Sequence, residues 1–197
     1  MAVTVNAIKC PGCGAPLADN QKTCDWCRAE VFIRSYETVA AMPAPQLNKY
    51  ALAYKQNLVE NPDHQELNES AAFCFLKLSM YDDAYNAFSK ALVNNFDNSE
   101  VFFYAAVSLL KGKKAFLHTR PEIDKMLELI NAALMIEPKG IYHYFMAYLK
   151  HDYFKRKFLT TTPNYKDCLV KAQAAGCTKA DIDLFYAAAG VDPVNMV

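Results

Sequence analysis

Four cysteines in two close pairs are the residues of this chain whose types and spacing imply definite chemistry. The first pair is Cys10 and Cys13, the second is Cys24 and Cys27, and ten residues separate the pairs. Each Cys-x-x-Cys segment can fold as a tight knuckle that directs two sulfur atoms at one point, so two knuckles complete a tetrahedral thiolate site. A closed site of this kind typically holds one structural Zn²⁺ ion.

The segment Cys-Pro-Gly-Cys-Gly at residues 10–14 supports the knuckle interpretation. Glycines allow the backbone to turn its N–H groups toward the sulfur atoms without steric cost. The N-terminal part of the chain resembles the short zinc ribbons of bacterial proteins, in which two Cys-x-x-Cys-Gly knuckles flank a turn. The resemblance implies a small β zinc ribbon over residues 1–36, with a closing strand over 30–35. Arg28 stands where the second knuckle usually has glycine, so we expect a less regular turn there.

Three other uses of the four cysteines stay open at this point: a pair of disulfides, a redox-active Cys-x-x-Cys and a rubredoxin-like iron site. A disulfide framework is typical of small secreted domains, whereas residues 1–9 show no basic start followed by an apolar run. A thioredoxin-like motif needs a strand–helix context, which the turn-rich segment 11–22 does not provide. The pattern therefore favours zinc.

Composition and charge limit the other function classes. The 197 residues are 53% apolar and have a formal net charge of zero, which argues against a protein that binds nucleic acid over its whole surface. Cys74, Cys168 and Cys177 lie in apolar segments typical of helices, so we expect reduced core thiols and a cytoplasmic protein. The longest apolar stretch, residues 101–110, is too short to span a membrane.

The composition changes after the cysteine pairs. Two prolines among small residues in the segment 37–46 indicate a linker, because proline restricts its own backbone and that of the preceding residue. From residue 47 onward, apolar residues recur at spacings of three and four, which predicts helices. We therefore expect a mainly α chain with a ribbon over 1–36, a linker over 37–46, a helical domain over 47–190 and a tail over 191–197.

Between residues 65 and 98, small and large apolar residues alternate in a fixed order. They are Ala71, Ala72, Phe75, Tyr81, Ala84, Phe88 and Ala91. This segment resembles a tetratricopeptide repeat (TPR), and the order restarts near residues 99 and 139 with insertions between the paired helices. The resemblance implies a TPR-like α-solenoid of about three helical hairpins, with a leading helix over 47–60 and a closing helix over 179–189. An irregular helical bundle is the alternative.

Repeats of this family curve so that the first helix of each pair lines a concave groove that holds a peptide or a helix. Carried over residue by residue, the resemblance implies one set of groove-lining positions here. They are Glu66, Glu69, Phe73, Lys77, Glu100, Phe103, Val107, Lys111, His143, Ala147, Lys150 and His151. We expect a peptide whose apolar anchor contacts Phe73 and Phe103. The ordering of acids before bases along each helix also follows from the helix dipole alone.

The two insertions carry a surplus of basic residues and several aromatic residues. Segment 111–120 has four cations and no acid, and segment 150–157 has four cations against Asp152. The candidate rim residues are Lys113, Lys114, Arg120, Lys155, Arg156 and Lys157. Equivalent loops of stacked repeats emerge on one edge, so these two can form a basic rim that holds phosphates and stacks bases. A solvated loop with inward-packed aromatics is the alternative.

No motif for catalysis is present in the sequence. The four histidines are spread over the chain, and His143 and His151 are too far apart along one helix to share a metal ion. Trp26 either covers the metal site or serves as an exposed docking residue. We expect a non-enzymatic adaptor that binds a protein or peptide, with nucleic-acid binding as the alternative function. The open end of a short solenoid also offers a surface for a homodimer.

Overall fold

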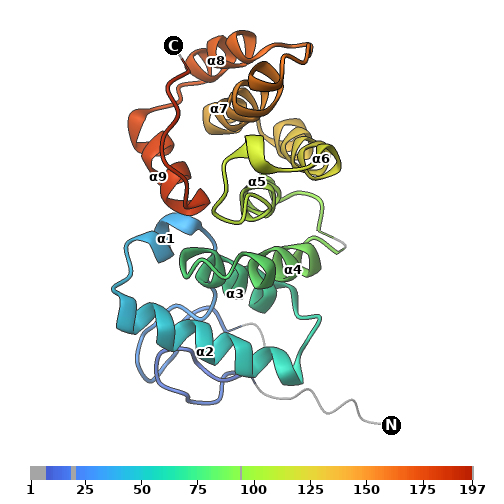
Figure 1. The fold of residues 1–197 in the computed structure, drawn as a ribbon. Coiled ribbons are helices and arrows are strands. Elements are labelled where there is room, and N and C mark those ends of the chain that lie inside the picture. Colours follow the sequence, from blue (N-terminus) through green and yellow to red (C-terminus); the bar gives the residue numbers. More distant parts are fainter. Residues whose placement is uncertain (1–7, 19–20, 94, 197) are drawn as a thin grey trace.

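The computed structural model describes residues 8–18, 21–93 and 95–196 of the chain. These residues contain nine α-helices and no β-strand (Figure 1). The helices are α1 (Tyr36–Ala40), α2 (Ala44–Glu60), α3 (Gln65–Lys77), α4 (Tyr81–Ala91), α5 (Ser99–Ser108), α6 (Arg120–Ile136), α7 (Gly140–Leu149), α8 (Tyr165–Ala174) and α9 (Lys179–Ala189). Three short turns of other helical types are η1 (Ala115–Leu117), η2 (Lys150–Phe154) and η3 (Lys155–Lys157).

Local sequence signals explain where several helices begin and end. Thr119, Asn164 and Thr178 stand before α6, α8 and α9, and each forms a capping box with an acidic residue three positions later. Gly190 ends α9 in the left-handed region, with φ of 64°. These capping interactions satisfy backbone groups that would otherwise have no partner at the helix ends.

Six helices form three consecutive hairpins: α3 with α4, α5 with α6, and α7 with α8 (Figure 1). Helix α2 packs on α3 ahead of the first hairpin, and α9 packs on α5 and α7 at the far end. Three alanines of the repeat pattern, Ala72, Ala84 and Ala91, are fully or almost fully buried between paired helices. Their small side chains allow the helices to approach closely, as the pattern predicted.

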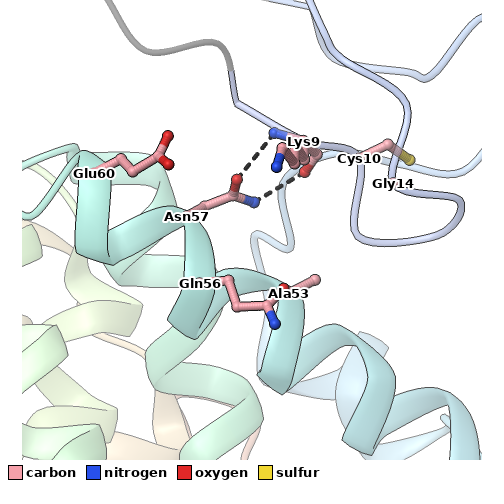
Figure 2. A pocket seen from close by; sticks show the side chains of 7 residues that line it. All are labelled: Lys9, Cys10, Gly14, Ala53, Gln56, Asn57 and Glu60. Carbon is pink, nitrogen blue, oxygen red and sulfur yellow. Dashed lines mark hydrogen bonds between the residues drawn. The ribbon is translucent and has the colours of Figure 1, made fainter.

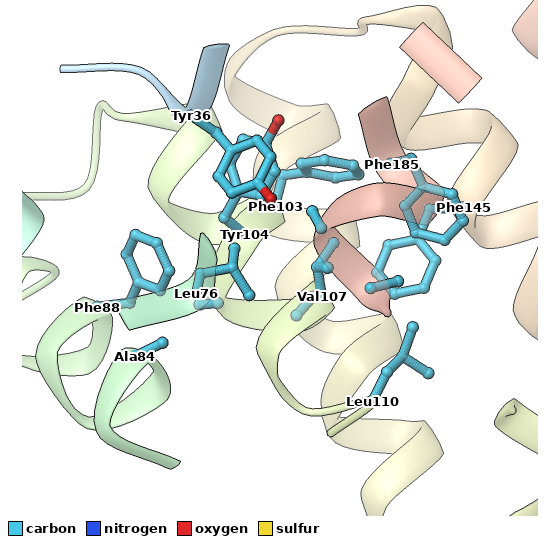
Figure 3. Packing of buried hydrophobic residues seen from close by; sticks show 14 of the residues in the cluster. Tyr36, Leu76, Ala84, Phe88, Phe103, Tyr104, Val107, Leu110, Phe145 and Phe185 are labelled. Atoms are coloured by element: carbon cyan, nitrogen blue, oxygen red, sulfur yellow. The ribbon is translucent and has the colours of Figure 1, made fainter. Parts of the chain in front are cut away.

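The core of the stack is rich in aromatic rings (Figure 3). Phe73 of α3 packs edge-to-face against Phe88 of α4 and Tyr104 of α5, at centroid distances of 5.2 and 5.7 Å. Phe103 of α5 continues the chain of rings to Phe145 of α7 at 5.8 Å. These contacts join all three hairpins into one hydrophobic core.

The segment 37–46, which the sequence analysis assigned to a linker, contains most of α1 and the first turn of α2. Tyr36 and Val39 of α1 are completely buried in the core of the stack. Pro45 lies in the first turn of α2, where a missing N–H group costs nothing. The prolines therefore start a helix here rather than mark an extended connection.

The ribbon that the resemblance implied is not built from β-strands in the described residues. Two isolated antiparallel bridges, Lys9 with Pro16 and Thr23 with Glu30, take their place. Of the expected closing strand over 30–35, only Glu30 makes a bridge. Side chains of the helices bind this segment instead of a neighbouring strand, since the backbone N–H of Ile33 donates to the Ser70 hydroxyl at 2.9 Å.

The segment after α9 packs back onto the stack rather than extending from it. The backbone N–H of Val194 donates to the Tyr186 hydroxyl at 3.1 Å, and Met196 is buried. Among the described residues, no helix has the length and apolar character needed to cross a membrane.

Candidate metal centre and partner-binding surfaces

The first cysteine pair lies in a tight turn whose backbone directs N–H groups inward. The N–H of Cys10 donates to Ala15 O, and the N–H of Gly14 donates to Cys10 O, both at 2.9 Å. The N–H of Gly12 points at Cys10 Sγ, at 3.3 Å. Gly14 has φ of 80°, a conformation that glycine adopts without a steric penalty.

The second pair repeats the same hydrogen-bond pattern fourteen residues later. The N–H of Cys24 donates to Ala29 O, and the N–H of Arg28 donates to Cys24 O, again both at 2.9 Å. Arg28 adopts φ of 60° at the position that corresponds to Gly14. The two knuckles therefore share one backbone path, and Arg28 takes the left-handed conformation that Gly14 has in the first knuckle.

The four sulfur atoms converge between the knuckles and lie within 4.8 Å of one another. Cys10 Sγ is 3.6 Å from Cys27 Sγ, and Cys13 Sγ is 3.7 Å from Cys24 Sγ. Sulfur ligands about 2.3 Å from a tetrahedral ion are separated by about 3.8 Å, whereas a disulfide bond measures about 2.0 Å. The predicted ligands Cys10, Cys13, Cys24 and Cys27 thus form a cluster that fits one metal ion.

The thiols of the cluster differ in their surroundings. Burial raises the pKa of Cys10 to about 12, since the charged thiolate loses water. Backbone N–H groups of Cys27 and Trp26 lower the pKa of Cys24 to about 7, because they stabilise its thiolate. A bound cation would favour the thiolate form of all four side chains.

Helix α2 holds the first knuckle against the stack (Figure 2). Asn57 accepts a hydrogen bond from Lys9 N and donates one to Lys9 O, both at 2.9 Å. The Tyr54 hydroxyl donates to Val31 O at 2.8 Å, and Lys49 Nζ donates to Gly12 O. The segment with the four cysteines is therefore fastened to the helical domain at several points.

No sequence motif points to Asn57, although its position along α2 carries a signal. Leu47, Tyr50, Ala51, Tyr54 and Asn57 follow a spacing of three and four along α2, and all five are buried. A polar residue at a buried position of an amphipathic helix needs a partner, which here is the backbone of the knuckle.

Trp26, between the second pair of cysteines, points into solvent. Its side chain is 81% exposed, so it does not cover the metal cluster. An exposed tryptophan on a tight turn is typical of residues that dock against another protein.

The positions expected to line a peptide groove are mostly covered. Glu69, Phe73, Phe103, Val107, Ala147 and Lys150 are buried. Glu66, Lys77, Glu100, His143 and His151 are half-buried, and Lys111 is exposed, where it pairs with Asp82. The inner surface of the stack is thus present, but its apolar residues are not accessible in this structure.

Helices α1 and α9 cover that surface (Figure 3). The ring of Tyr36 from α1 lies 4.8 Å from Tyr104, and the Tyr36 N–H donates to Glu100 Oε1 at 3.0 Å. Phe185 of α9 lies 4.8 Å from Phe145 and 6.4 Å from Phe103. The chain therefore places two of its own helices over the surface where the resemblance to tetratricopeptide repeats predicted a peptide.

Two carboxyl groups on the inner surface of the stack have raised pKa values. Burial raises the pKa of Glu69 to about 7, although Asn98 donates a hydrogen bond to its Oε1 at 3.2 Å. Burial also raises the pKa of Glu100, although the Tyr36 N–H stabilises the carboxylate and opposes this increase. Both groups lose hydration when α1 and its neighbours cover them.

The two basic insertions lie side by side, as expected. The N–H of Phe116 donates to Asp152 Oδ2 at 2.9 Å, and Lys157 Nζ reaches His118 O at 3.4 Å. These contacts join the turn after α5 to the turn after α7.

Several rim cations are already engaged by the protein. Arg156 pairs with the buried Asp152 at 2.7 Å and lies over the Phe116 ring, and Lys157 lies over the Tyr153 ring. Arg120 pairs with Asp124 and lies over Phe154. Lys155 is exposed and lies over the Tyr165 ring, Lys113 is exposed, and Lys114 is half-buried. Most ring faces that bases would need are thus covered by the protein's own cations, and nucleic-acid binding stays an untested prediction.

No family model matches the chain, and no curated protein matches it significantly. Among solved structures, the chain is similar to one titled MamA MSR-1 C2, a TPR protein. The TM-score is 0.52 and the sequence identity is 17%, over 71% of this chain and 70% of that chain. At this identity the likeness concerns the fold: the chain contains a TPR-like helical stack.

Proposed function

We propose that this chain is a non-enzymatic adaptor in which the helical stack and the knuckles each contact a protein partner. The TPR-like fold supports a protein-interaction scaffold. In the described residues, no histidine hydrogen-bonds to a serine, threonine or cysteine side chain, the arrangement that activates a nucleophile. A scaffold role agrees with both observations.

The ion in this proposal is one structural Zn²⁺ held by Cys10, Cys13, Cys24 and Cys27. Four thiolates at tetrahedral separations leave no ligand position for a substrate, which supports a structural role. The ion would bind the knuckles together where the hydrophobic cluster is small, with only Cys10, Leu17, Cys24 and Val31 buried in it.

The exposure of Trp26 is the observation that carries the docking role of the knuckles. Interface hot spots are enriched in tryptophan, and they are effective when the backbone beneath is rigid before binding. The ligand cysteines on both sides of Trp26 provide that rigidity when the ion is bound.

The inner surface of the stack is the second contact in this proposal. A cavity of about 200 Å³ remains between α1 and α9, and Phe103, Tyr104 and Tyr142 form part of its wall. A partner helix would occupy this surface by replacing α9. An aromatic side chain of the partner would then take the position of Phe185, which packs against Phe145.

The test is affinity capture from the native cell, followed by binding measurements with the purified partner. We expect Trp26→Ala to keep its zinc and to weaken partner binding about tenfold or more, whereas Leu52→Ala, which removes an exposed apolar side chain from α2, leaves binding unchanged. Equal affinities of the wild type and Trp26→Ala would refute docking by the knuckle.

A second pair of variants tests the inner surface. Phe185→Leu should weaken the hold of α9 and tighten binding of a partner that replaces it, relative to the exposed-site control Asp183→Asn. Unchanged binding in a folded Phe185→Leu protein would show that the partner does not compete with α9.

A further inference from the structure

The backbone directly after α7 is irregular over nine consecutive residues. A π-helical turn, η2 (Lys150–Phe154), passes into the 3₁₀ turn η3 (Lys155–Lys157) and then into Phe158, which has φ of 58°. Left-handed backbone is unfavourable for a bulky side chain, and π-helical turns are frequent at functional sites. The Phe158 ring is 95% exposed, so no packing contact in the structure compensates for this conformation.

A cavity of about 380 Å³ lies between this irregular segment and the start of α8. Its wall combines cationic, hydroxyl and aromatic groups. They come from Lys150, Lys155, Phe158, Thr160, Thr161 and Tyr165. A volume of this size accommodates a small organic molecule.

Lys150 is the most informative residue of the wall. Its side chain is only 6% exposed, and its Nζ donates to Thr161 Oγ1 at 2.8 Å and lies 5.9 Å from the centre of the Phe154 ring. Within the described residues, no carboxylate lies at ion-pair distance from it. Burial accordingly lowers the pKa of Lys150.

A neighbouring buried charge shows how proteins usually stabilise a charged group in their interior. Asp152, two residues later, is completely buried and pairs with Arg156 at 2.7 Å. Buried charges in proteins are normally paired in this way, because an unpaired charge loses its hydration without compensation. Lys150 lacks the corresponding anion, and it lines an open cavity where one can bind.

The other groups of the wall suit the rest of such a ligand. Lys155 adds a second cation, with its Nζ 3.1 Å from the Tyr165 hydroxyl and 4.8 Å from the centre of that ring. The threonine hydroxyls can donate hydrogen bonds to an oxyanion. The exposed Phe158 ring offers an apolar face beside the cations.

We propose that this cavity binds a small organic oxyanion, a phosphate or a carboxylate, that carries a flat apolar group. Lys150 and Thr161 contact the oxyanion, Lys155 adds positive charge, and Phe158 packs against the flat group. This site is separate from the metal cluster and from the surface beneath α9, and the inference does not depend on the adaptor function.

Isothermal titration of the full-length, metal-loaded protein tests the inference. The probes are adenosine monophosphate, naphthalene carboxylate and inorganic phosphate, each at up to millimolar concentration. We expect saturable binding of at least one of the two ring-bearing probes, and the preference between them distinguishes a phosphate from a carboxylate head. Absence of binding by both would overturn the proposal.

Two lysine variants locate the site. Lys150→Met keeps the length of the side chain and removes its charge, so affinity should fall about tenfold or more. The exposed Lys171→Met on α8 is the matched control and should bind as the wild type does. Equal loss in both variants, or full binding by Lys150→Met, would contradict the assignment.

The unfolding midpoint separates a ligand-binding lysine from a merely structural one. Lys150→Met removes a charge that has no ionic partner, so its midpoint should not be lower than that of the wild type. Phe158→Gly adopts the left-handed backbone without strain, so it should stay folded and reduce affinity for the ring-bearing probes to the level of inorganic phosphate. Unchanged affinity in Phe158→Gly would remove the role of its ring.

Discussion

The side-chain amide of Asn57 on α2 bonds to both backbone polar groups of Lys9, and each hydrogen bond is 2.9 Å long (Figure 2). This pairing satisfies the backbone N–H and C=O of Lys9 as a neighbouring strand would. The cysteine cluster therefore has a defined position on the helical stack, because hydrogen bonds join the two parts of the chain.

Replacing Asn57 should weaken that link. We expect Asn57→Ala to lower the free energy of unfolding by about 1–3 kcal/mol, because two hydrogen bonds at a buried position are lost. Urea unfolding followed by circular dichroism measures the change. Gln56→Ala, which changes the exposed neighbour of Asn57 on α2, should differ from the wild type by less than about 0.5 kcal/mol.

Removal of a thiolate ligand should remove the ion. We expect the purified protein to contain one zinc ion per chain, and Cys27→Ser to lose most of it, because the closed site needs all four sulfur atoms. Elemental analysis measures the zinc content, and a chelator should lower the unfolding midpoint of the wild type but not that of Cys27→Ser. Cys177→Ser, a half-buried cysteine outside the cluster, should keep its metal. A metal-free wild type would contradict this prediction, and iron in place of zinc would correct the identity of the ion.

The left-handed conformation of Arg28 predicts a stabilising substitution. Arg28→Gly should raise the free energy of unfolding of the metal-bound protein by about 1 kcal/mol, since glycine adopts φ of 60° without a clash between Cβ and the backbone. Chemical unfolding at saturating zinc provides the measurement. The reverse change at the equivalent site, Gly14→Ala, should destabilise, and opposite signs in the two variants confirm the equivalence of the knuckles.

The raised pKa of Glu69 predicts that the free energy of unfolding falls as the pH increases from about 4.5 to about 7. Because burial raises the pKa of this carboxyl to about 7, the folded chain holds a proton that the unfolded chain releases near its ordinary pKa of 4.5. The retained proton adds up to about 3 kcal/mol to the free energy of unfolding at low pH, and this contribution is lost as the pH rises through 7. The raised pKa of Glu100 acts in the same direction.

Unfolding free energies measured across this pH range test the prediction. Glu69→Gln carries no titrating proton, so its stability should fall less steeply with pH than that of the wild type. Glu66→Gln, whose side chain is only half-buried on the same helix, serves as the control. Identical pH profiles of Glu69→Gln and the wild type would show that this carboxyl ionises normally in the folded state.

The cysteine spacing predicted the four-cysteine cluster and the three-and-four periodicity predicted the helical stack, because both signals depend on residues near one another in the chain. The small residues Ala72, Ala84 and Ala91 indicated where paired helices approach each other, and they are buried there. Such local patterns need no knowledge of distant segments.

Only the tertiary structure decided what covers the inner surface of the stack. The prolines at residues 43 and 45 indicated a linker, yet Tyr36 and Val39 are buried in the core, and Phe185 packs against Phe103 from the other end of the chain. The contacts of Tyr36 with Tyr104 and of Phe185 with Phe103 join residues more than sixty positions apart, and their energy comes from burying apolar area rather than from any local preference. For the same reason, the buried Lys150 without an ionic partner is evident only when α8 and the turn after α7 lie together.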